Sequence, residues 1–303
     1  MRVIVVGMGV QGHKRKAVAG KDVVATVDPI NPSAEYKNIL DVPLMSFDSA
    51  LLCIPDEPKV NIIEYLLENG KNVLVEKPLF ASNSNCLHRL QDISERKKVV
   101  CYTAYNHRFE PHFVRMKELL DSKVLGRIYS VKMFYGNGTA RLVRNSEWRD
   151  KGDGVLPDLG SHLLDTASFW FGQEFKELSL YSANRFENRA FDHITFGTKS
   201  TPLLQFELTL LSWRNHFYAD VIAENGSAHI NSLCKWGPST FTFRKRVLPS
   251  GRPNEEVVTL VQEDPTWSLE YEHFKKLCKQ GSGNIHNDIW INEALQNLSA
   301  YLV

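Results

Sequence analysis

The chain has 303 residues, of which 43% are hydrophobic and 23% charged, and its formal net charge is +1. This length predicts two domains, and the near-neutral charge gives no electrostatic reason to expect nucleic acid or a membrane surface as a partner. Five scattered cysteines without a C-x-x-C pair favour reduced thiols in the cytoplasm, and we expect no metal site.

The first predicted element is a short apolar strand over residues 2–6, which is too short for a signal peptide or a membrane span. A G-x-G-x-x-G motif follows it directly, and a helix is expected over residues 13–19. Such glycines permit a tight turn and let backbone N–H groups approach a pyrophosphate at the helix N-terminus. The residues that we expect to bind the cofactor here are Gly7, Gly9, Val10, Gln11 and Gly12.

A second strand, residues 23–27, ends in Asp28, about twenty residues after the glycines. At this spacing a carboxylate binds the ribose 2′-hydroxyl of a dinucleotide. Because Asp28 would also repel a 2′-phosphate, NAD is favoured over NADP, although Lys14 and Arg15 keep NADP open. The glycines alone would suit a turn without a ligand, and it is their combination with the strands, the helix and the acid that predicts a dinucleotide site.

The rest of this domain predicts a doubly wound parallel sheet. Residues 29–48 hold three prolines and no long periodic pattern, so a loop is expected in place of a second crossover helix. The apolar run from Asn72 predicts a central strand with Glu76 and Lys77 at its carboxyl end, where open α/β sheets bind ligands. Further strands are expected over 50–54 and 99–103, and helices over 59–68, 82–97 and 111–120. The predicted dinucleotide-binding domain is residues 1–121.

Residues 122–303 are predicted to form an α+β domain with a large, mostly antiparallel open sheet, for substrate binding and oligomerisation. Aromatic side chains on one sheet face, in the Tyr129 or the Phe134 set, suggest a homo-oligomer, a dimer or tetramer. Two helices are expected to close the chain, over 269–279 and 288–301. The predicted strands are 127–135, 177–183, 193–198, 203–211, 217–223, 240–247 and 256–261.

The segment 152–170 carries the pattern most typical of chemistry. Asp158, His162 and Asp165 stand at i, i+4 and i+7, so one helix would present all three on one face. A histidine moves protons near neutral pH, and a nearby aspartate orients it and tunes its pKa. The alternative is a solvated helix face that carries these residues without a function.

Taken together, these motifs resemble the Gfo/Idh/MocA family, the glucose–fructose oxidoreductase and inositol dehydrogenase type of nicotinamide enzymes. The resemblance covers nearly the whole chain, and its most specific part is E-K-P combined with D-x-G-x-H-x-x-D. It implies a Rossmann domain followed by an α+β domain. The motifs are Gly7–Gly12, Cys53–Pro55, Asn69–Val73, Glu76–Pro78, Tyr105–Phe109, Leu125–Ile128, Trp148–Arg149 and Asp158–Asp165.

The resemblance also implies roles for single residues. Lys77 is expected beside the nicotinamide and the substrate hydroxyl, with a cis peptide to Pro78, and Asp158 and His162 as the acid–base pair. Further cofactor contacts are implied for Ile54, Pro55 and Glu76, and further substrate contacts for Asn106, Arg108, Trp148 and Arg149. The chain departs from the family pattern at Lys59, where a histidine is usual, at Gly152-Asp153-Gly154 and at Pro157.

The sequence therefore predicts an NAD(H)-dependent dehydrogenase that oxidises a secondary alcohol of a sugar, cyclitol or nucleotide sugar. Arg141, Arg144 and Arg149 would suit the phosphates of a nucleotide sugar, or are solvated loop charges. Two alternatives stay open: a non-catalytic dinucleotide-binding regulator on the same fold, and an imine or biliverdin-type reductase. The retention of Lys77, Asp158 and His162 together argues against the regulator, because a pure binder needs none of them.

Overall fold

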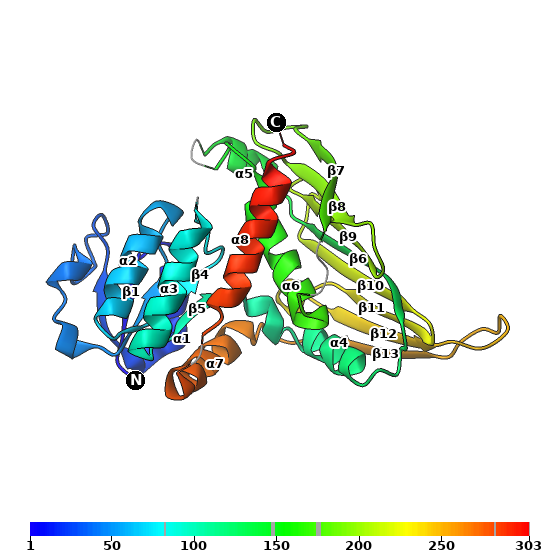
Figure 1. Ribbon diagram of the computed structural model, residues 1–303, viewed down its shortest axis with the longest axis horizontal. Helices are drawn as coiled ribbons and strands as arrows, with labels where there is room; N and C mark the ends of the chain where they lie inside the picture. The colour runs from blue at the N-terminus through cyan, green and yellow to red at the C-terminus, as the bar shows by residue number, and fades with distance from the viewer. Residues whose placement is uncertain (82, 147–148, 174–176, 282, 303) are drawn as a thin grey trace. The chain divides into compact units, whose positions relative to one another are not determined.

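The computed structural model describes residues 1–303 except 82, 147–148, 174–176, 282 and 303. The chain forms two compact units (Figure 1). Unit 1 comprises residues 1–106 and 265–293, and unit 2 comprises residues 107–264 and 294–303. These units differ from the predicted ranges 1–121 and 122–303 in two places. The helix after Pro111 belongs to unit 2, and a late segment of the chain returns to complete unit 1.

The sheet of unit 1 has five strands in the order β2-β1-β3-β4-β5, and all of its pairs are parallel. The strands are β1 (Val3–Val6), β2 (Val23–Val27), β3 (Ser49–Leu52), β4 (Asn72–Glu76) and β5 (Cys101–Ala104). Continuous apolar runs such as Val3–Val6 are buried along their whole length, as strands covered on both faces require. The doubly wound sheet predicted from the sequence is confirmed.

Helices cover both faces of this sheet. Alternate residues of β1 face opposite ways, so Ile4 and Val6 join one apolar cluster and Val3 and Val5 join the other. The helices α2 (Asp56–Glu68) and α3 (Ser84–Lys97) and the first turns of α8 (Ile285–Ser299) contribute to the first cluster. The helices α1 (Val10–Ala19) and α7 (Thr266–Gln280) contribute to the second. Because α7 supplies Tyr271 and Phe274 to this core, the returning segment is part of unit 1.

Unit 2 is built on an eight-stranded sheet in the order β13-β12-β11-β10-β6-β9-β8-β7. Only the pair β6·β9 among its described ladders is parallel. The mostly antiparallel sheet is thus confirmed, but β11 lies where the sequence predicted no strand. The strands are β6 (Ile128–Gly136), β7 (Leu178–Asn184), β8 (His193–Thr198), β9 (Leu203–Thr209), β10 (His216–Ala223), β11 (Gly226–Asn231), β12 (Ser239–Lys245) and β13 (Glu255–Leu260).

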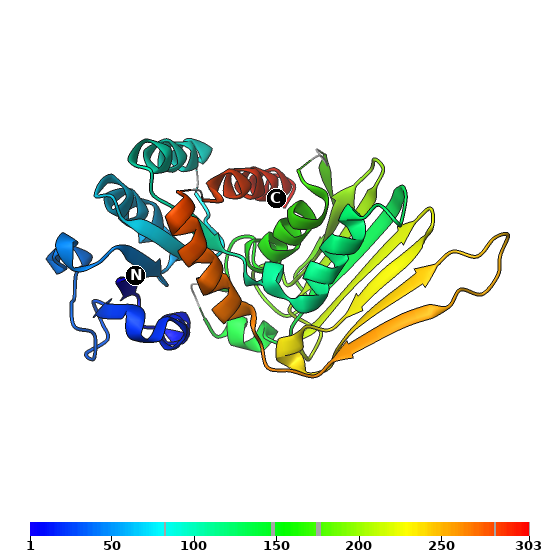
Figure 2. The same ribbon diagram turned by 90° about the horizontal axis from the view of Figure 1, so that it is seen from below.

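Two helices of unit 2 pack side by side on one face of this sheet (Figure 2). They are α4 (Pro111–Asp121) and α6 (Ser161–Phe171), and the short helix α5 (Ala140–Arg144) follows β6. The Trp170 indole of α6 donates to the Phe113 carbonyl of α4 at 3.1 Å, and the two rings lie 5.2 Å apart. This contact fixes the helix that carries His162 and Asp165 against the core of unit 2.

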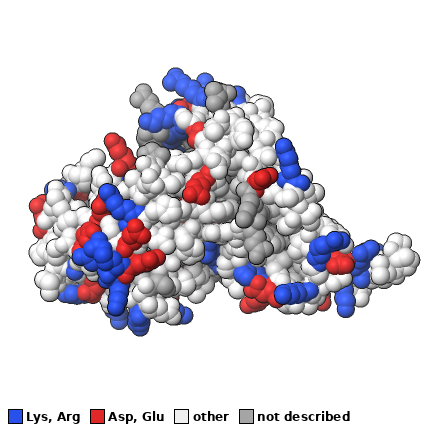
Figure 3. Space-filling model, viewed as in Figure 1, with Lys and Arg blue, Asp and Glu red and all other residues white. Residues whose placement is uncertain are grey.

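Charged side chains of both signs are interspersed over α2 and α3 in the face shown in Figure 3. Ion pairs connect the two helices there, for example between Arg96 and Glu68 at 2.6 Å. Among the described residues, no helix is both long enough and apolar enough to cross a bilayer. All five cysteines are free thiols; Cys101 and Cys234 are buried and the other three half-buried.

Candidate functional site

The glycine loop of unit 1 connects β1 to α1, and its glycines serve two different purposes. A Cβ on Gly7 would lie 2.4 Å from the Cys53 carbonyl oxygen, and one on Gly12 would lie 1.9 Å from the Gly7 carbonyl oxygen. These two glycines are required by close backbone packing. A Cβ on Gly9 would meet no described atom within 4 Å, although Gly9 stands immediately before α1. The open space at this helix N-terminus fits a pyrophosphate.

Asp28 ties the glycine loop to the loop that follows β2. Its Oδ2 accepts from the Met8 N–H at 2.7 Å, and its Oδ1 accepts from the N–H groups of Ile30 and Asn31 at 2.8 Å each. Partial burial opposes ionisation, but these N–H donors lower the pKa of Asp28 below its ordinary value. A carboxylate offers about four acceptor positions, so this charged group can also receive a ribose hydroxyl. Val10 and Gln11 form the first turn of α1, and the loop fits an NAD-type cofactor.

The E-K-P segment follows β4, and the peptide between Lys77 and Pro78 is cis, as predicted. Glu76 accepts from Arg15 Nε at 2.6 Å, and the same guanidinium pairs with Glu270 at 2.7 Å. Arg15 is 1% exposed and lies 4.3 Å from the ring centre of Trp267. Burial works against its charge, yet the Glu270 and Glu76 carboxylates raise the pKa of Arg15 above its ordinary value. The end of β4 is thereby attached to α1 and α7.

Lys59 is a second buried cation beside this segment. Its ammonium lies 2.6 Å from Asp56 Oδ1 and 3.0 Å from each of the carbonyl oxygens of Glu76 and Pro78. The predicted cofactor residues Ile54 and Pro55 form the turn between β3 and α2, whose first residue is Asp56. Lys59 therefore connects this turn with the E-K-P segment, a role that the sequence did not indicate.

Asn106 is the last residue of the first chain segment of unit 1. Its side chain is buried and donates to Thr266 Oγ1 at 2.8 Å. This bond attaches the chain after β5 to the start of α7. The proposed substrate contact of Asn106 stays a prediction.

In unit 2, Asp158 and His162 do not belong to one regular α-helix. Asp158 lies in a π-helical turn, Leu156–Gly160, and α6 begins only at Ser161. Asp158 thus lies in a π-turn before the α-helix that the sequence predicted for it, and its pairing with His162 stays a prediction. Pro157, which cannot supply an N–H, occupies this turn. Such turns inside helices are frequent at functional sites.

The His162 ring is 6% exposed and lies among other rings. It stacks on the His107 ring, with centres 4.1 Å apart and planes inclined by 18°, and it lies 5.8 Å from the Tyr135 ring. His107 Nε2 in turn lies 3.4 Å from Lys235 Nζ. The sequence assigns no role to His107, because no spacing rule connects it with His162.

Asp165 is 1% exposed and is held by Arg108 through two hydrogen-bonding atoms of the guanidinium. Arg108 Nε lies 2.9 Å from Asp165 Oδ2, and its terminal nitrogen lies 2.6 Å from Oδ1. This bidentate pair supports a structural role for Asp165. Arg108 remains partly exposed, so its substrate contact is still a prediction.

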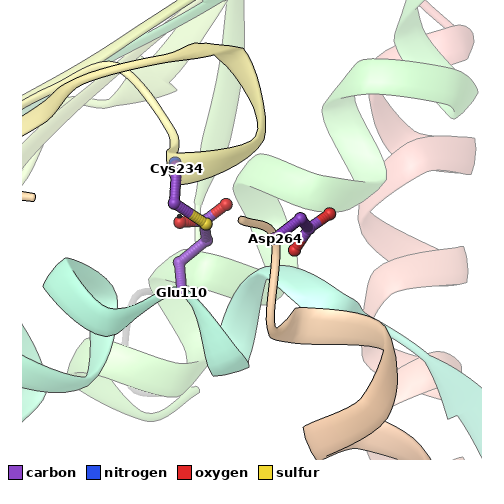
Figure 4. A group of neighbouring side chains, drawn as sticks. All are labelled: Glu110, Cys234 and Asp264. Carbon is purple, nitrogen blue, oxygen red and sulfur yellow. Dashed lines mark hydrogen bonds between the residues drawn. The ribbon is translucent and has the colours of Figure 1, made fainter. Parts of the chain in front are cut away.

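A third cluster in unit 2 consists of Glu110, Cys234 and Asp264 (Figure 4). Each residue offers one potential metal-ligand atom, and these atoms lie within 4.8 Å of one another. Glu110 already accepts hydrogen bonds from the Cys234 N–H, at 3.1 Å, and from its thiol. Burial raises the pKa of Glu110, although the nearby Lys235 ammonium acts in the opposite direction. A hydrogen-bonded thiol and carboxyl beside a lysine explain this cluster without a cation.

The remaining predicted substrate residues lie around α5. Trp148 is outside the described residues, and the Arg149 N–H donates to the Ser146 carbonyl at 2.9 Å. A polar groove of about 520 Å³ lies at α5. Arg141 lies 3.9 Å from Glu187 there. The groove is lined by Arg141, Arg144, Asn145, Phe186, Glu187 and Asn188.

The parallel sheet with its glycine loop and the following, mostly antiparallel sheet define a class of two-domain proteins with a dinucleotide-binding fold. Two family models identify the family to which the chain belongs. The model of the oxidoreductase family with an NAD-binding Rossmann fold matches residues 1–105, and that of the GFO/IDH/MocA C-terminal domain matches residues 113–229. The chain belongs to the Gfo/Idh/MocA family, as the sequence motifs predicted.

Individual relatives are distant. The chain is 31% identical over 146 residues to an uncharacterized oxidoreductase of Schizosaccharomyces pombe. The aligned region is 46% of this chain and 39% of that protein. The chain thus spans less than half the length of this relative. It is 23% identical to the scyllo-inositol 2-dehydrogenase (NAD(+)) of Bacillus subtilis over 95% of this chain and 89% of that protein. Levoglucosan dehydrogenase in complex with NADH has the same fold, with a TM-score of 0.83 and 18% identity over 99% of this chain and 97% of that one.

Proposed function

We propose that the chain is an NAD(H)-dependent oxidoreductase that transfers a hydride between nicotinamide and a secondary alcohol of a sugar, cyclitol or nucleotide sugar. The observation that carries this proposal is the buried imidazole of His162 at the start of α6, directly after the π-turn with Asp158. A protein that only binds a dinucleotide has no use for such a group. The dehydrogenases of inositol and levoglucosan among the similar proteins support the same substrate class.

In this proposal, unit 1 binds the cofactor. The N–H groups at the start of α1, from Val10 and Gln11, face the pyrophosphate, and Asp28 binds the adenosine ribose. The remaining contacts to the cofactor come from the carboxyl ends of β3 and β4, through Ile54, Pro55 and Glu76. When bound, NAD supplies the hydride acceptor. The carboxylate of Asp28 disfavours the 2′-phosphate of NADP by charge repulsion.

The chemical roles follow from the types of side chain. His162 accepts the hydroxyl proton, which a neutral imidazole does near physiological pH. Asp158 orients this ring, and Lys77 binds the alcohol oxygen and stabilises the negative charge that develops on it. Asn106, Arg108, Trp148 and Arg149 are proposed to hold the other hydroxyls.

The substrate class has two branches. Arg141 and Arg144 in the groove at α5 would suit a phosphate, which favours a nucleotide sugar. The inositol-type relatives favour a neutral polyol instead. We also propose a homo-oligomer, which sedimentation analysis of the purified protein would test.

The test combines cofactor binding and turnover on the purified chain. We expect NADH to bind with fluorescence enhancement, and NAD⁺ to be reduced with at least one alcohol from a panel of inositols, aldoses and uridine-diphosphate sugars. Turnover with a diphosphate sugar alone would favour the nucleotide-sugar branch. Tight NADH binding without turnover of any alcohol would reject the dehydrogenase and leave the regulator and the imine or biliverdin-type reductase.

A further inference from the structure

Lys59 is a buried lysine whose hydrogen-bonding capacity is fully used. It is 2% exposed, and its Nζ reaches three oxygen atoms within 3.0 Å, from Asp56, Glu76 and Pro78. A lysine ammonium has three N–H donors, so one acceptor corresponds to each of them. Burying an ammonium is costly unless it is paired in this way. The environment of Lys59 is therefore specific for a cation with three donors.

Two of the three acceptors are main-chain carbonyls that flank Lys77. The Glu76 carbonyl precedes Lys77 and the Pro78 carbonyl follows it, and both lie 3.0 Å from the same Nζ. Pro78 has no N–H, so this part of the chain cannot extend the ladder of β4 by its own donors. Lys59 supplies donors from outside the strand to both carbonyl oxygens.

The third acceptor connects this segment to a different loop. Asp56 is the first residue of α2 and follows directly on Pro55. Glu76 is fixed independently through its side chain, by the buried guanidinium of Arg15. The peptide group that precedes Lys77 and the one that follows Pro78 are thus both bonded to one ammonium, which holds the backbone on either side of Lys77.

We propose that Lys59 is a positioning residue for Lys77, which holds the backbone on both sides of Lys77 so that its amine is presented in one direction. This inference rests on the proposed function, because only there does Lys77 act on the alcohol oxygen. It adds to that function a residue that touches neither substrate nor cofactor. A misplacement of about 1 Å at a reacting group can cost about a hundredfold in rate, so the support of Lys77 bears directly on turnover.

The experiment replaces Lys59 by an apolar residue of similar length and uses a matched control. Lys59→Met removes the ammonium and leaves both carbonyls without this donor. Lys71→Met is the control, because Lys71 is a half-buried lysine at the other end of β4 that donates to the Phe47 carbonyl at 2.9 Å. Thermal unfolding of both variants shows whether each one is folded at the assay temperature.

The first measurement needs no substrate. The NADH-loaded wild type and variants are treated with an amine-acylating reagent, and the rate of modification at Lys77 is followed by peptide mass spectrometry across pH. We expect Lys59→Met to change the rate at Lys77 and its pH dependence, and Lys71→Met to leave both as in the wild type. An unchanged profile at Lys77 in folded Lys59→Met would overturn the proposal.

The second measurement is turnover of the alcohol found in the panel. Lys59→Met should lower kcat by about tenfold or more, with the KM for NAD near that of the wild type. If Lys59 acts through Lys77, the double variant with Lys77→Met should be no slower than Lys77→Met alone. Independent, multiplying losses would assign Lys59 to a different role and overturn the proposal.

The experiment also distinguishes failure of the proposed function from failure of the Lys59 variant to fold. If the wild type oxidises no alcohol, the proposed function fails, while the acylation profile of Lys77 still decides the role of Lys59. If Lys59→Met does not fold, Lys59→Gln replaces it, because its amide nitrogen is one atom closer to the backbone and has two donors, so it cannot reach all three acceptors. An acylation profile of Lys77 in Lys59→Gln that equals the wild type would then overturn the proposal.

Discussion

The segments around Lys77 in unit 1 and around His162 in unit 2 carry the proposed chemistry, and they are held by different interactions. The backbone and acid beside Lys77 are fixed by two buried cations, Arg15 and Lys59. The His162 ring is fixed by stacking on His107 and by the packing of its helix on the core of unit 2. Charge thus holds the backbone beside Lys77 and ring packing holds the His162 ring itself, although the helix of His162 also carries the Arg108–Asp165 ion pair.

This difference predicts how substitutions in each segment affect stability and activity. A buried ion pair is sensitive to the loss of either partner, because the remaining charge is left without compensation. Stacked rings lose packing area when one is removed, and no charge is stranded. Substitution of a cation beside Lys77 should therefore lower stability, whereas substitution of the His162 ring should affect activity more than folding.

The largest effect is expected on stability, when the buried guanidinium of Arg15 is removed from unit 1. Arg15→Met leaves the buried carboxylates of Glu76 and Glu270 without their guanidinium, and should lower the free energy of unfolding by about 3–5 kcal/mol. The control is Arg89→Met, whose exposed pair with Glu64 should be worth at most about 1 kcal/mol. Urea unfolding of both variants measures this. Equal losses would show that the buried triad is not a special support.

The second prediction tests the ring-packed segment. His162→Ala should lower turnover by about a hundredfold or more, the usual contribution of a positioned base, while NAD affinity and the unfolding temperature stay close to those of the wild type. His193→Ala, a half-buried histidine on β8, is the control and should keep its turnover. Near-normal turnover of His162→Ala would remove it as the base. A large loss of stability would contradict the contrast with unit 1.

Much of the fold was predictable because local patterns agree with the tertiary structure. The strand over 23–27 has the predicted bounds, and the motif of Gly7 to Gly12 lies between β1 and α1 as expected. β11 was missed because its sequence, Gly226–Asn231, contains glycine, serine and asparagine, which have low strand propensity. This strand forms because β10 and β12 pair with it on both sides.

The site was less predictable, because its supports come from residues far apart in the sequence. Arg15 meets Glu270 across 255 positions, a pairing that no spacing rule contains. The π-turn at Asp158 could not be read from a pattern that assumes 3.6 residues per turn. Lys59 was visible only as a departure from the family pattern, and its three acceptors became apparent only in the folded chain.

At the cofactor loop, neutral N–H donors hold the charged carboxylate of Asp28, in contrast to the buried cations beside Lys77. Asp28→Ala should weaken NADH binding by about tenfold, since about 1.4 kcal/mol is a plausible share for one charged hydrogen bond. It should also reduce the discrimination against NADPH, because the repelling charge is lost. Fluorescence titration with both cofactors measures this. A wild type that prefers NADPH by about tenfold or more would show that the role of Asp28 is misassigned.

The smallest expected effect concerns Glu110, a buried acid of unit 2 whose Oε1 has no hydrogen-bond partner among the described residues. Burial raises its pKa, so its ionisation costs more in the folded chain than in the unfolded one. The stability that its neutral form contributes is complete below its ordinary pKa and is lost as the pH rises through the folded pKa.

Glu110→Gln cannot ionise, so its unfolding temperature should fall less than that of the wild type as the pH rises from about 4 towards neutrality. Thermal unfolding across this range measures the difference, with Glu118→Gln, an exposed position on α4, as the control. Parallel curves for Glu110→Gln and the wild type would mean that the thiol and the N–H of Cys234 compensate for burial. In that case unit 2 would stabilise a buried carboxylate without a guanidinium, and the contrast with Glu76 and Glu270 would weaken.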